Sequence, residues 1–578
     1  MNGTIEDHTS DPCFRGSEVF DKDETMMAEQ YVIGVDFGSD SVRAIVVNTV
    51  TGKEAGSAAA CYPRWKKGLY QHPEKDIFRQ HPKDYLEALE ECVTGALAAL
   101  SAEQRAAVVG IGIDTTGSTP VPVDREGTPL SLLPGFEENE NAMFHLWKDH
   151  SAFREAAEID EMFSGGSDTD YTRYQGTYCS EWFWAKVLHT TRTDSQIRSA
   201  AYTWVEHCDW MVGLLCGNTC PEQMYHSACA AGHKALWHSA WNGLPGEDVL
   251  ARLDPALSRI RERYGRAPEC SDAVAGTLCG EWAQRLGLSE QVKVSGSSFD
   301  AHAGAVGAGI REKTVVCTIG TSAVDMIVAR PEDLEGKDLF CYGGQAENSI
   351  VPGYVGVETG QAAFGDIFAW FKKLLLWPVK TAASEKNGEW DGMLEELEER
   401  VLVDLQKAAM ELPREPFPIS LDWFNGRRYP ENDDFQKAVI ADVSLGTEAP
   451  YLYRSLVFGA ICGLKRILEG FMRQGVELEH VVAAGGISKK SDYVMQMMAD
   501  MLGKEVDILE ADQTCALGAA IYAAVAGGAY DTFQEASAHL ASPVIRTYRP
   551  DPEAGAWYQE HYEEYLRLAG LQDQRNKK

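Results

Sequence analysis

The chain has 578 residues, of which 87 are acidic and 53 basic, and its formal net charge at pH 7 is -34. This charge repels polyanions at long range, so neither nucleic acid nor an anionic membrane surface is an expected partner. The length exceeds what one hydrophobic core normally supports, which predicts at least two domains.

The first predicted element is an N-terminal tail. Residues 1–30 are polar and acidic and lack the apolar core of a signal peptide, so we expect a disordered or loosely attached segment. No apolar run approaches membrane-spanning length, and the 14 cysteines are scattered without CxxC pairs. We therefore expect a cytoplasmic protein with reduced thiols.

The next element is a β-hairpin, VIGVDFGSDSVRAIVV, at residues 32–47. Its turn contains Gly38, Ser39 and Asp40, and successive backbone N–H groups in such a turn can form a nest for phosphate without any basic side chain. A plain tight turn is the alternative reading of one such turn alone. Asp36 ends the first strand, where a phosphate would repel it unless Mg²⁺ lay between them.

Three elements recur further along the chain in the same order. A second hairpin at 314–329 matches the first without a gap, so that its turn of Gly320, Thr321 and Ser322 is a second candidate phosphate loop. The other repeats are an apolar strand with a polar turn, at 108–118 and 481–491, and a strand followed by a small-residue helix, at 292–309 and 506–527. This order predicts a duplicated α/β core with a nucleotide between two lobes, because two distant copies are too few for a solenoid.

These repeats suggest the domain boundaries. We expect a first lobe at 31–310, a hinge at 311–313, a second lobe at 314–535 and a C-terminal segment at 536–578. In that last segment Tyr558, Tyr562, Tyr565, Leu566 and Ala569 have helical spacing, which predicts an amphipathic docking helix before a frayed end.

Several polar residues at strand ends are candidates for chemistry. Asp300 lies between a strand and a helix, where it is either a helix N-cap or a carboxylate facing phosphate. Gly485 and Gly486 either let the backbone approach a nucleotide or form a simple turn. His302 is interpreted as a structural histidine with satisfied hydrogen bonds rather than a supporting group of the site. The cysteines and histidines at 207–233 are interpreted as structural, since only Cys216 and Cys220 have the spacing of zinc ligands.

The order of these loops and helices resembles the actin, sugar kinase and Hsp70 superfamily, and residues 31–527 resemble the FGGY carbohydrate kinases, in particular the ribulokinases. The matching words are YPRWKKG at 62–68, IDTTGSTPVPVD at 113–124, NAMFHLWKDH at 141–150, YCSEWFWAK at 178–186, AGHKALWH at 231–238, GTLCGEWAQRLGL at 276–288, GQAAFGDIFAWF at 360–371 and LDWFNGRR at 421–428.

The resemblance implies two actin-like (ribonuclease H-like) α/β lobes and an ATP-dependent phosphorylation of a ketopentose. L-ribulose, converted to L-ribulose 5-phosphate as in arabinose catabolism, is the expected substrate. ATP would be the co-substrate with Mg²⁺ at Asp36, and Asp300 would be the catalytic base. Small residues at Gly117 and Ser118 would leave room for the sugar, with Lys234 and Glu358 as its hydroxyl partners.

Alternatives follow from the same resemblance. Xylulose or ribitol could be the acceptor, and an actin- or Hsp70-like ATPase could use the same nucleotide site on a protein partner. The segment 147–149 resembles the sugar side of the family, and Arg427 and Arg428 could pair with phosphate or with local acids. A homodimer would be compatible with this family.

Overall fold

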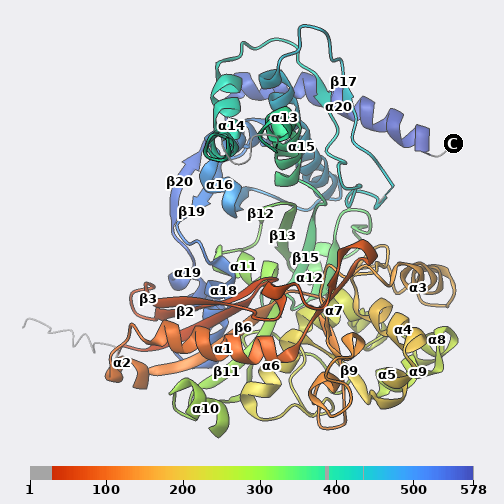
Figure 1. Cartoon of the computed structure of the whole chain (residues 1–578), viewed down its shortest axis with the longest axis vertical. Helices are drawn as coiled ribbons and strands as arrows, with labels where there is room; N and C mark the ends of the chain where they lie inside the picture. Colours follow the sequence, from red (N-terminus) through yellow and green to blue (C-terminus); the bar gives the residue numbers. More distant parts are fainter. Residues whose placement is uncertain (1–28, 385–389, 434, 577–578) are drawn as a thin grey trace, which may run out of the picture.

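The computed structural model describes residues 29–384, 390–433 and 435–576. Almost all of the predicted N-terminal tail and the last two residues therefore lie outside the described residues. The described chain forms two bodies stacked along the longest axis (Figure 1). Each body contains one large mixed sheet.

The sheet of the first lobe has the strand order β10-β11-β6-β1-β2-β3. Strand β1 pairs antiparallel with β2 and parallel with β6, and β11 extends the parallel side. The bounds are β1 (Tyr31–Phe37), β2 (Ser41–Asn48), β3 (Glu54–Cys61), β6 (Val108–Thr115), β10 (Val274–Thr277) and β11 (Lys293–Phe299).

The sheet of the second lobe has the order β14-β15-β13-β12-β18-β19-β20. Strand β12 pairs antiparallel with β13 and parallel with β18, so β15-β13-β12-β18-β19 repeats the β3-β2-β1-β6-β11 arrangement. The predicted duplicated α/β core is confirmed. The bounds are β12 (Thr314–Ile319), β13 (Ala323–Ala329), β14 (Gly344–Glu347), β15 (Val355–Gln361), β18 (His480–Ala484), β19 (Val506–Leu509) and β20 (Val544–Tyr548).

Two helices of small residues cross between the sheets, α11 (Asp300–Gly307) and α18 (Thr514–Ala526). A Cβ at Gly518 would fall 1.8 Å from the carbonyl oxygen of Ala303, and one at Gly307 would fall 2.0 Å from that of Thr514. Glycine therefore permits the close crossing, as the composition of these helices predicts.

Helix α18 also packs against the sheet of the first lobe. A Cβ at Gly34 of β1 would fall 1.8 Å from the carbonyl oxygen of Ala516. Apolar residues of α11 and α18 join residues of both sheets, such as Val32 and Val316, in one buried cluster. The expected boundary at 314 thus assigns α18 to the second lobe by sequence, although part of its packing is with the first.

The remaining helices and short strands surround these sheets. An aromatic-rich cluster that includes Trp182, Phe183 and Trp184 forms a separate core in the first lobe. The helices of the first lobe are α1 (Pro82–Leu97), α2 (Ala102–Ala106), α3 (Phe153–Gly165), α4 (Phe183–Thr193), α5 (Ser195–Ala200), α6 (His207–Cys216), α7 (Ala228–Ala235), α8 (Glu247–Leu253), α9 (Pro255–Glu262) and α10 (Gly280–Leu286). Its short strands are β4 (Gln71–His72), β5 (Ile77–Gln80), β7 (Pro120–Val123), β8 (Phe144–His145) and β9 (Thr203–Glu206).

In the second half, the large helix α15 packs between its sheet and α20, and α13 and α14 lie beside it (Figure 1). The bounds are α12 (Pro331–Leu334), α13 (Gly365–Ser384), α14 (Asp391–Glu411), β16 (Ile419–Ser420), β17 (Ile440–Ala441), α15 (Ala449–Arg473), α16 (Gly486–Lys490), α17 (Asp492–Leu502), α19 (Phe533–Leu540) and α20 (Pro552–Asn576).

The C-terminal helix α20 packs on the core of the second lobe. Tyr558, Tyr562, Tyr565 and Ala569 are buried, as their spacing predicts. The prediction for Leu566 is wrong, since 39% of this residue is exposed, because it lies at the edge of the buried face. Among the described residues, none of the helices is both long and apolar enough to span a lipid bilayer.

Candidate active site

Three carboxylates lie together at the end of the first sheet. In the parallel register of β1 and β6, Asp36 is opposite Asp114, and Asp114 is also opposite Ser298 of β11. Asp300 follows β11 as the first residue of α11. The carboxyl ends of parallel strands thus bring three acids to one edge.

Their mutual proximity is visible in the pKa values. Burial, and then the charge of Asp36, raises the pKa of Asp300 to about 7. Burial, together with the charges of Asp36 and Asp300, raises the pKa of Asp114 well above its ordinary value. Apart from the carboxyl group of Asp36, neither oxygen of Asp114 has a hydrogen-bond partner in the described part of the chain. The three carboxyl groups therefore disfavour one another's ionisation in this structure.

Arg43 faces this group. The guanidinium of Arg43, on β2, lies 3.1 Å from Asp36 and is about half exposed. Burial nevertheless raises the pKa of Asp36. In the second sheet the equivalent register pairs Thr318 with Ala484, so the acids belong to the first copy alone. Both copies of the duplicated core thus have a phosphate loop, whereas only the first copy carries the carboxylates.

Asp300 does not cap its helix. Its carboxylate accepts a hydrogen bond from the N–H of the next residue, Ala301, at 2.7 Å, whereas an N-cap side chain would accept from the second or third residue beyond it. Phe299 occupies the cap position. The carboxylate is therefore available for other partners.

The first phosphate loop is held by side chains from several elements. The hydroxyl of Tyr62 donates to the carbonyl oxygen of Gly38 at 3.0 Å, and the amide of Gln80 donates to that of Ser39 at 2.7 Å. The indole N–H groups of Trp147 and Trp65 donate to Ser39 Oγ at 2.9 Å and to Asp40 Oδ1 at 2.6 Å. These bonds hold the loop in place. The side chains of Ser39 and Asp40 accept two of them, so they already have partners within the protein.

The second phosphate loop is held by the start of α13. The N–H groups of Phe364 and Asp366 both donate to the carbonyl oxygen of Thr321, at 2.8 and 3.0 Å. Gly320 N donates to Ser322 O at 2.9 Å, as Gly38 N does to Ser41 O at 3.0 Å in the first loop. In both loops the glycine N–H donates within the turn, but the acceptor lies two residues ahead in the second loop and three residues ahead in the first.

The glycine pair after β18 lies beside this second loop. Gly485 has a φ of +87°, and a Cβ there would fall 2.6 Å from the carbonyl oxygen of Ile319. A Cβ at Gly486 would meet nothing within 4 Å. Gly485 is therefore required by the backbone, whereas Gly486 offers open backbone at the start of α16.

The predicted sugar partners meet across the two lobes. Lys234 Nζ on α7 lies 3.0 Å from Glu358 Oε2 on β15. Burial alone would lower the pKa of Lys234, but the charge of Glu358 outweighs it and raises that pKa. Burial opposes ionisation of Glu358, yet the Lys234 ammonium holds the pKa of this carboxyl well below its usual range. The pair is therefore ionised.

This pair lies near Asp300, on the strand that leads to the second phosphate loop. Glu358 and Lys234 both influence the pKa of Asp300. Strand β15 then runs three residues further to Gln361, which is opposite Ala323 at the end of the second loop. The base candidate, the sugar candidates and one phosphate loop are thus brought to the same side.

The turn at Gly117 and Ser118 is filled rather than open. A Cβ at Gly117 would fall 2.0 Å from the ring of Phe299, so the expectation that a small residue leaves room there is wrong. Ser118 is buried, its hydroxyl donates to Glu206, and its carbonyl oxygen accepts from Lys186 Nζ at 2.7 Å. Only the backbone of this turn remains for a ligand.

Other candidates have partners elsewhere. Arg427 lies 2.6 Å from Asp573 of α20, and Arg428 lies 4.0 Å from Glu181, so both arginines face local acids. Asp149 accepts a hydrogen bond from Phe78 N and pairs with the buried Arg79, which indicates a structural role.

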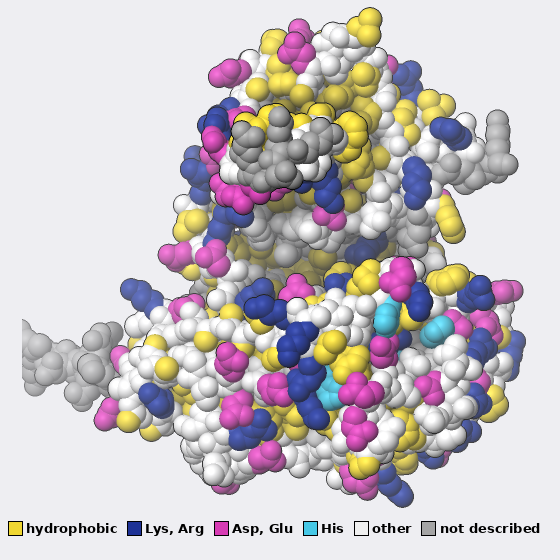
Figure 2. Space-filling view, viewed as in Figure 1, with side chains coloured by type: hydrophobic (Ala, Val, Ile, Leu, Met, Phe, Trp, Pro, Cys, Tyr) yellow, Lys and Arg dark blue, Asp and Glu magenta, His cyan; other side chains and the backbone are white. Residues whose placement is uncertain are grey.

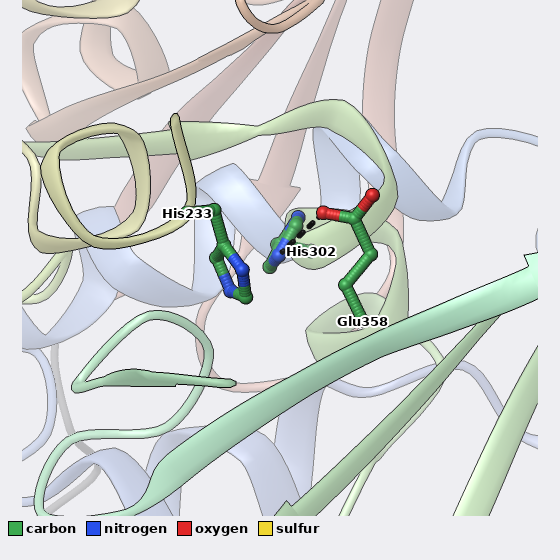
Figure 3. A group of neighbouring side chains, drawn as sticks. All are labelled: His233, His302 and Glu358. Atoms are coloured by element: carbon green, nitrogen blue, oxygen red, sulfur yellow. Dashed lines mark ion pairs between the residues drawn. The ribbon is translucent and has the colours of Figure 1, made fainter. Parts of the chain in front are cut away.

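The histidines of the 207–233 segment are likewise dispersed. His226 pairs with Asp209 at 3.1 Å, and His207 stacks on Tyr85 with ring centroids 3.8 Å apart. His233 instead lies beside His302 and Glu358 (Figure 3). The segment therefore supplies one histidine to the site and does not gather into a cluster of its own.

The interpretation of His302 as a satisfied structural histidine is wrong. Its ring is buried, and neither nitrogen has a hydrogen-bond partner among the described residues. Its Nε2 lies 3.7 Å from Glu358 Oε2. Burial lowers the pKa of His302 to about 4, so the ring is neutral at pH 7.

A separate hollow of about 1410 Å³ lies away from these residues. It is lined by parts of β2, α18 and α19, among them Val47, Leu517 and His539. None of the predicted site residues lines it. Its size alone therefore does not make it the active site.

On the face of the molecule shown in Figure 2, acidic and basic side chains lie interspersed over the lower lobe.

Sequence reasoning missed Asp114. The word IDTTGST contains this acid, but a single aspartate at a strand end is a weak signal. Aligning the strand at 108–115 with that at 31–37 would have shown that both carry an aspartate as the last residue but one, just before a turn. Only the register of β1 and β6 makes the two carboxylates neighbours.

Comparison with known proteins bears on this site. Residues 315–527 match the C-terminal domain model of the FGGY family of carbohydrate kinases. A ribulokinase of Vibrio parahaemolyticus is 44% identical over 548 residues, covering 94% of this chain and 96% of that protein. A ribulokinase of Shouchella clausii is 34% identical, covering 93% and 95%. The chain belongs to the FGGY family of carbohydrate kinases.

Solved structures agree on the fold. The xylulose kinase from Rhodospirillum rubrum superposes with a TM-score of 0.77 at 19% identity, covering 95% of this chain and all of that one. The Plasmodium falciparum glycerol kinase with ADP gives 0.73 at 15% identity, covering 94% and 98%. The predicted two-lobe kinase fold is confirmed. This FGGY kinase is accordingly an enzyme that phosphorylates a carbohydrate, and its family implies ATP as the co-substrate.

Proposed function

We propose that this FGGY kinase transfers the γ-phosphoryl group of ATP to the terminal hydroxyl of L-ribulose, giving L-ribulose 5-phosphate. The substrate is chosen because the ribulokinases named above align over nearly the whole chain. Asp300 carries the proposal, because it is a carboxylate with a pKa of about 7 beside an ion pair that joins the lobes.

In this proposal Asp300 accepts the proton of the terminal hydroxyl. The hydroxyl oxygen forms a bond to the γ-phosphorus while the bond from that phosphorus to the β–γ bridging oxygen breaks, and ADP leaves with that oxygen. A base with a pKa near 7 is well matched to operation at neutral pH. Lys234 and Glu358 would orient the other hydroxyls, and the backbone turn at Gly117 would contact the sugar.

The phosphate tail would be held by the two loops. Gly38, Ser39 and Asp40 on one side and Gly320, Thr321 and Ser322 on the other present backbone amides, and Gly485 and Gly486 would flank the adenosine. Their fixed geometry requires little reorganisation when charge shifts during transfer.

Mg²⁺ fits the acidic edge. The carboxyl group of Asp114 is buried, and among the described residues only Asp36, its neighbour across the strand register, contacts it by a hydrogen bond. Oxygen ligands of this kind suit Mg²⁺, so Asp36 and Asp114 would hold the ion directly or through water. Bound there, Mg²⁺ would neutralise phosphate charge beside the carboxylates.

The test is the variant Asp300→Asn. We expect a fall in kcat of at least about a thousandfold, since the base is lost, with the Kd for Mg-ATP changed less than about twofold. Turnover is measured as sugar-dependent ADP release, and nucleotide binding by calorimetry.

The matched control is Asp272→Asn, which changes a carboxylate of the same lobe that the proposal does not use. It should keep wild-type turnover. An Asp300→Asn enzyme that retained most of its kcat would exclude Asp300 as the base.

A further inference from the structure

His233, His302 and Glu358 form a compact group at the junction of the two lobes (Figure 3). Each offers one ligand atom, and these atoms lie within 4.8 Å of one another. His233 comes from α7, His302 from α11 and Glu358 from β15. The three residues therefore join the first lobe, a linking helix and the second lobe.

His302 is the member of this group whose ring nitrogens have no hydrogen-bond partner among the described residues. The residue is 1% exposed. Leaving a buried polar atom unpaired costs about 1–3 kcal/mol, so such a nitrogen usually has a partner at some stage of a protein's function. Its Nε2 points toward Glu358 Oε2 across 3.7 Å, which is close to the separation of two ligands on one small metal ion.

The neighbours of the group are arranged to support ligands. His233 has Gln175 Oε1 at 3.3 Å from Nδ1 and Ser349 Oγ at 3.1 Å from Nε2, so one nitrogen could bind a metal while the other keeps its partner. Metal-binding histidines are commonly held in this way. Lys234 Nζ is within 3.3 Å of both oxygens of Glu358, so one oxygen could stay with the ammonium while the other binds a metal.

We infer that His233, His302 and Glu358 form a binding site for Zn²⁺ or a similar transition-metal ion, distinct from the acidic edge where Mg²⁺ fits. Two imidazoles and one carboxylate are a donor set that suits Zn²⁺ and Co²⁺, whereas Mg²⁺ prefers oxygen ligands. The fourth position would be open to water.

The bound ion would inhibit the kinase. It would tie α7 and α11 to β15 and occupy Glu358, which, if the proposed function holds, is a sugar partner. Zn²⁺ would then raise the apparent KM for the sugar. Whether the metal binds at all can be measured without knowing which sugar the enzyme phosphorylates.

The first experiment measures binding to the full chain under reducing conditions. Co²⁺ is titrated and its visible absorption bands recorded, and the affinity for Zn²⁺ is obtained by competition with a chromophoric chelator. We expect one site with nitrogen and oxygen ligands, and a loss of affinity of more than about tenfold in His302→Ala. The control His480→Ala removes an exposed histidine of β18 and should bind as the wild type does.

Thiols are the competing ligands, because Cys61 is exposed and other cysteines are partly so. A thiolate-to-Co²⁺ charge-transfer band, or equal affinity in the wild type and His302→Ala, would overturn the proposal. X-ray absorption of the Zn²⁺-loaded wild type gives a reading that does not depend on how the variant folds. Two imidazole ligands and no sulfur are expected, and sulfur ligands would contradict the site.

Discussion

Asp300 shows how one residue acquires a function from its surroundings. The raised pKa follows from burial and from the charge of Asp36, both of which disfavour the ionised form. A base must be ionised, so we expect kcat/KM for the sugar to rise with pH and level off above a midpoint near 7. At pH 6 only about a tenth of the carboxyl groups would be ionised. A pH profile at saturating Mg-ATP checks this, and a midpoint below about 5 would contradict it.

Asp325 is another buried carboxylate, opposite Cys317 on the hairpin of the second lobe. Burial raises its pKa from 3.8 to about 7. The folded chain therefore keeps a proton that the unfolded chain releases, and this residue lowers stability progressively as the pH rises from about 4 to about 7.

Asp325→Asn should therefore raise the free energy of unfolding at pH 8 by about 1–3 kcal/mol, with the gain disappearing near pH 4. Denaturant unfolding at the two pH values measures it. A gain of equal size at both pH values would show that the charge is not the cause.

At the scale of elements, the crossing of α11 and α18 places Asp300. Alanine at Gly518 would bring a Cβ within 1.8 Å of the carbonyl oxygen of Ala303, three residues beyond Asp300. We expect Gly518→Ala to lower stability by about 3 kcal/mol or more and to reduce kcat, because the helices must separate. Thermal unfolding and turnover measure the two effects.

A helical glycine in open space provides the comparison. Gly570 lies in α20 with nothing within 4 Å of a built Cβ. Gly570→Ala should be neutral or stabilise by up to about 1 kcal/mol, since alanine favours helix. If both variants were equally stable, the close crossing would not be the constraint described.

Elements with a repeated or periodic pattern could be predicted from sequence. The two hairpins, the two apolar strands and the two small-residue helices appear in the predicted order because each is a local pattern of strand formers, turn residues or small residues. The buried tyrosines of α20 follow from helical spacing, and Leu566 fails because it falls at the edge of that face.

Contacts between distant segments could not be predicted in this way. Asp114 becomes part of the acidic edge only through strand register, and the space beside Gly117 is filled by Phe299, 182 positions away. The family resemblance points to Lys234 and Glu358 individually as sugar partners, but it does not predict that they form an ion pair with each other. His302 looks ordinary in the sequence, because a missing hydrogen-bond partner is a property of the folded surroundings.

At the scale of the whole molecule, the two lobes are joined beside the site. Lys234 bonds Glu358, and Gln175 Nε2 donates to the carbonyl oxygen of Gln345 at 2.6 Å. Closing the lobes over sugar and nucleotide would exclude water, so ATP hydrolysis without sugar should be slow. An ATPase acting on a protein partner would not require a sugar.

The most direct measurement is the rate of ADP release with Mg-ATP and L-ribulose, D-xylulose or ribitol, each against a blank without sugar. The account predicts that L-ribulose gives the highest kcat/KM, with one ADP released per sugar phosphate formed, and that the blank is slower by about two orders of magnitude. ADP release that is equally fast in the blank would contradict the account.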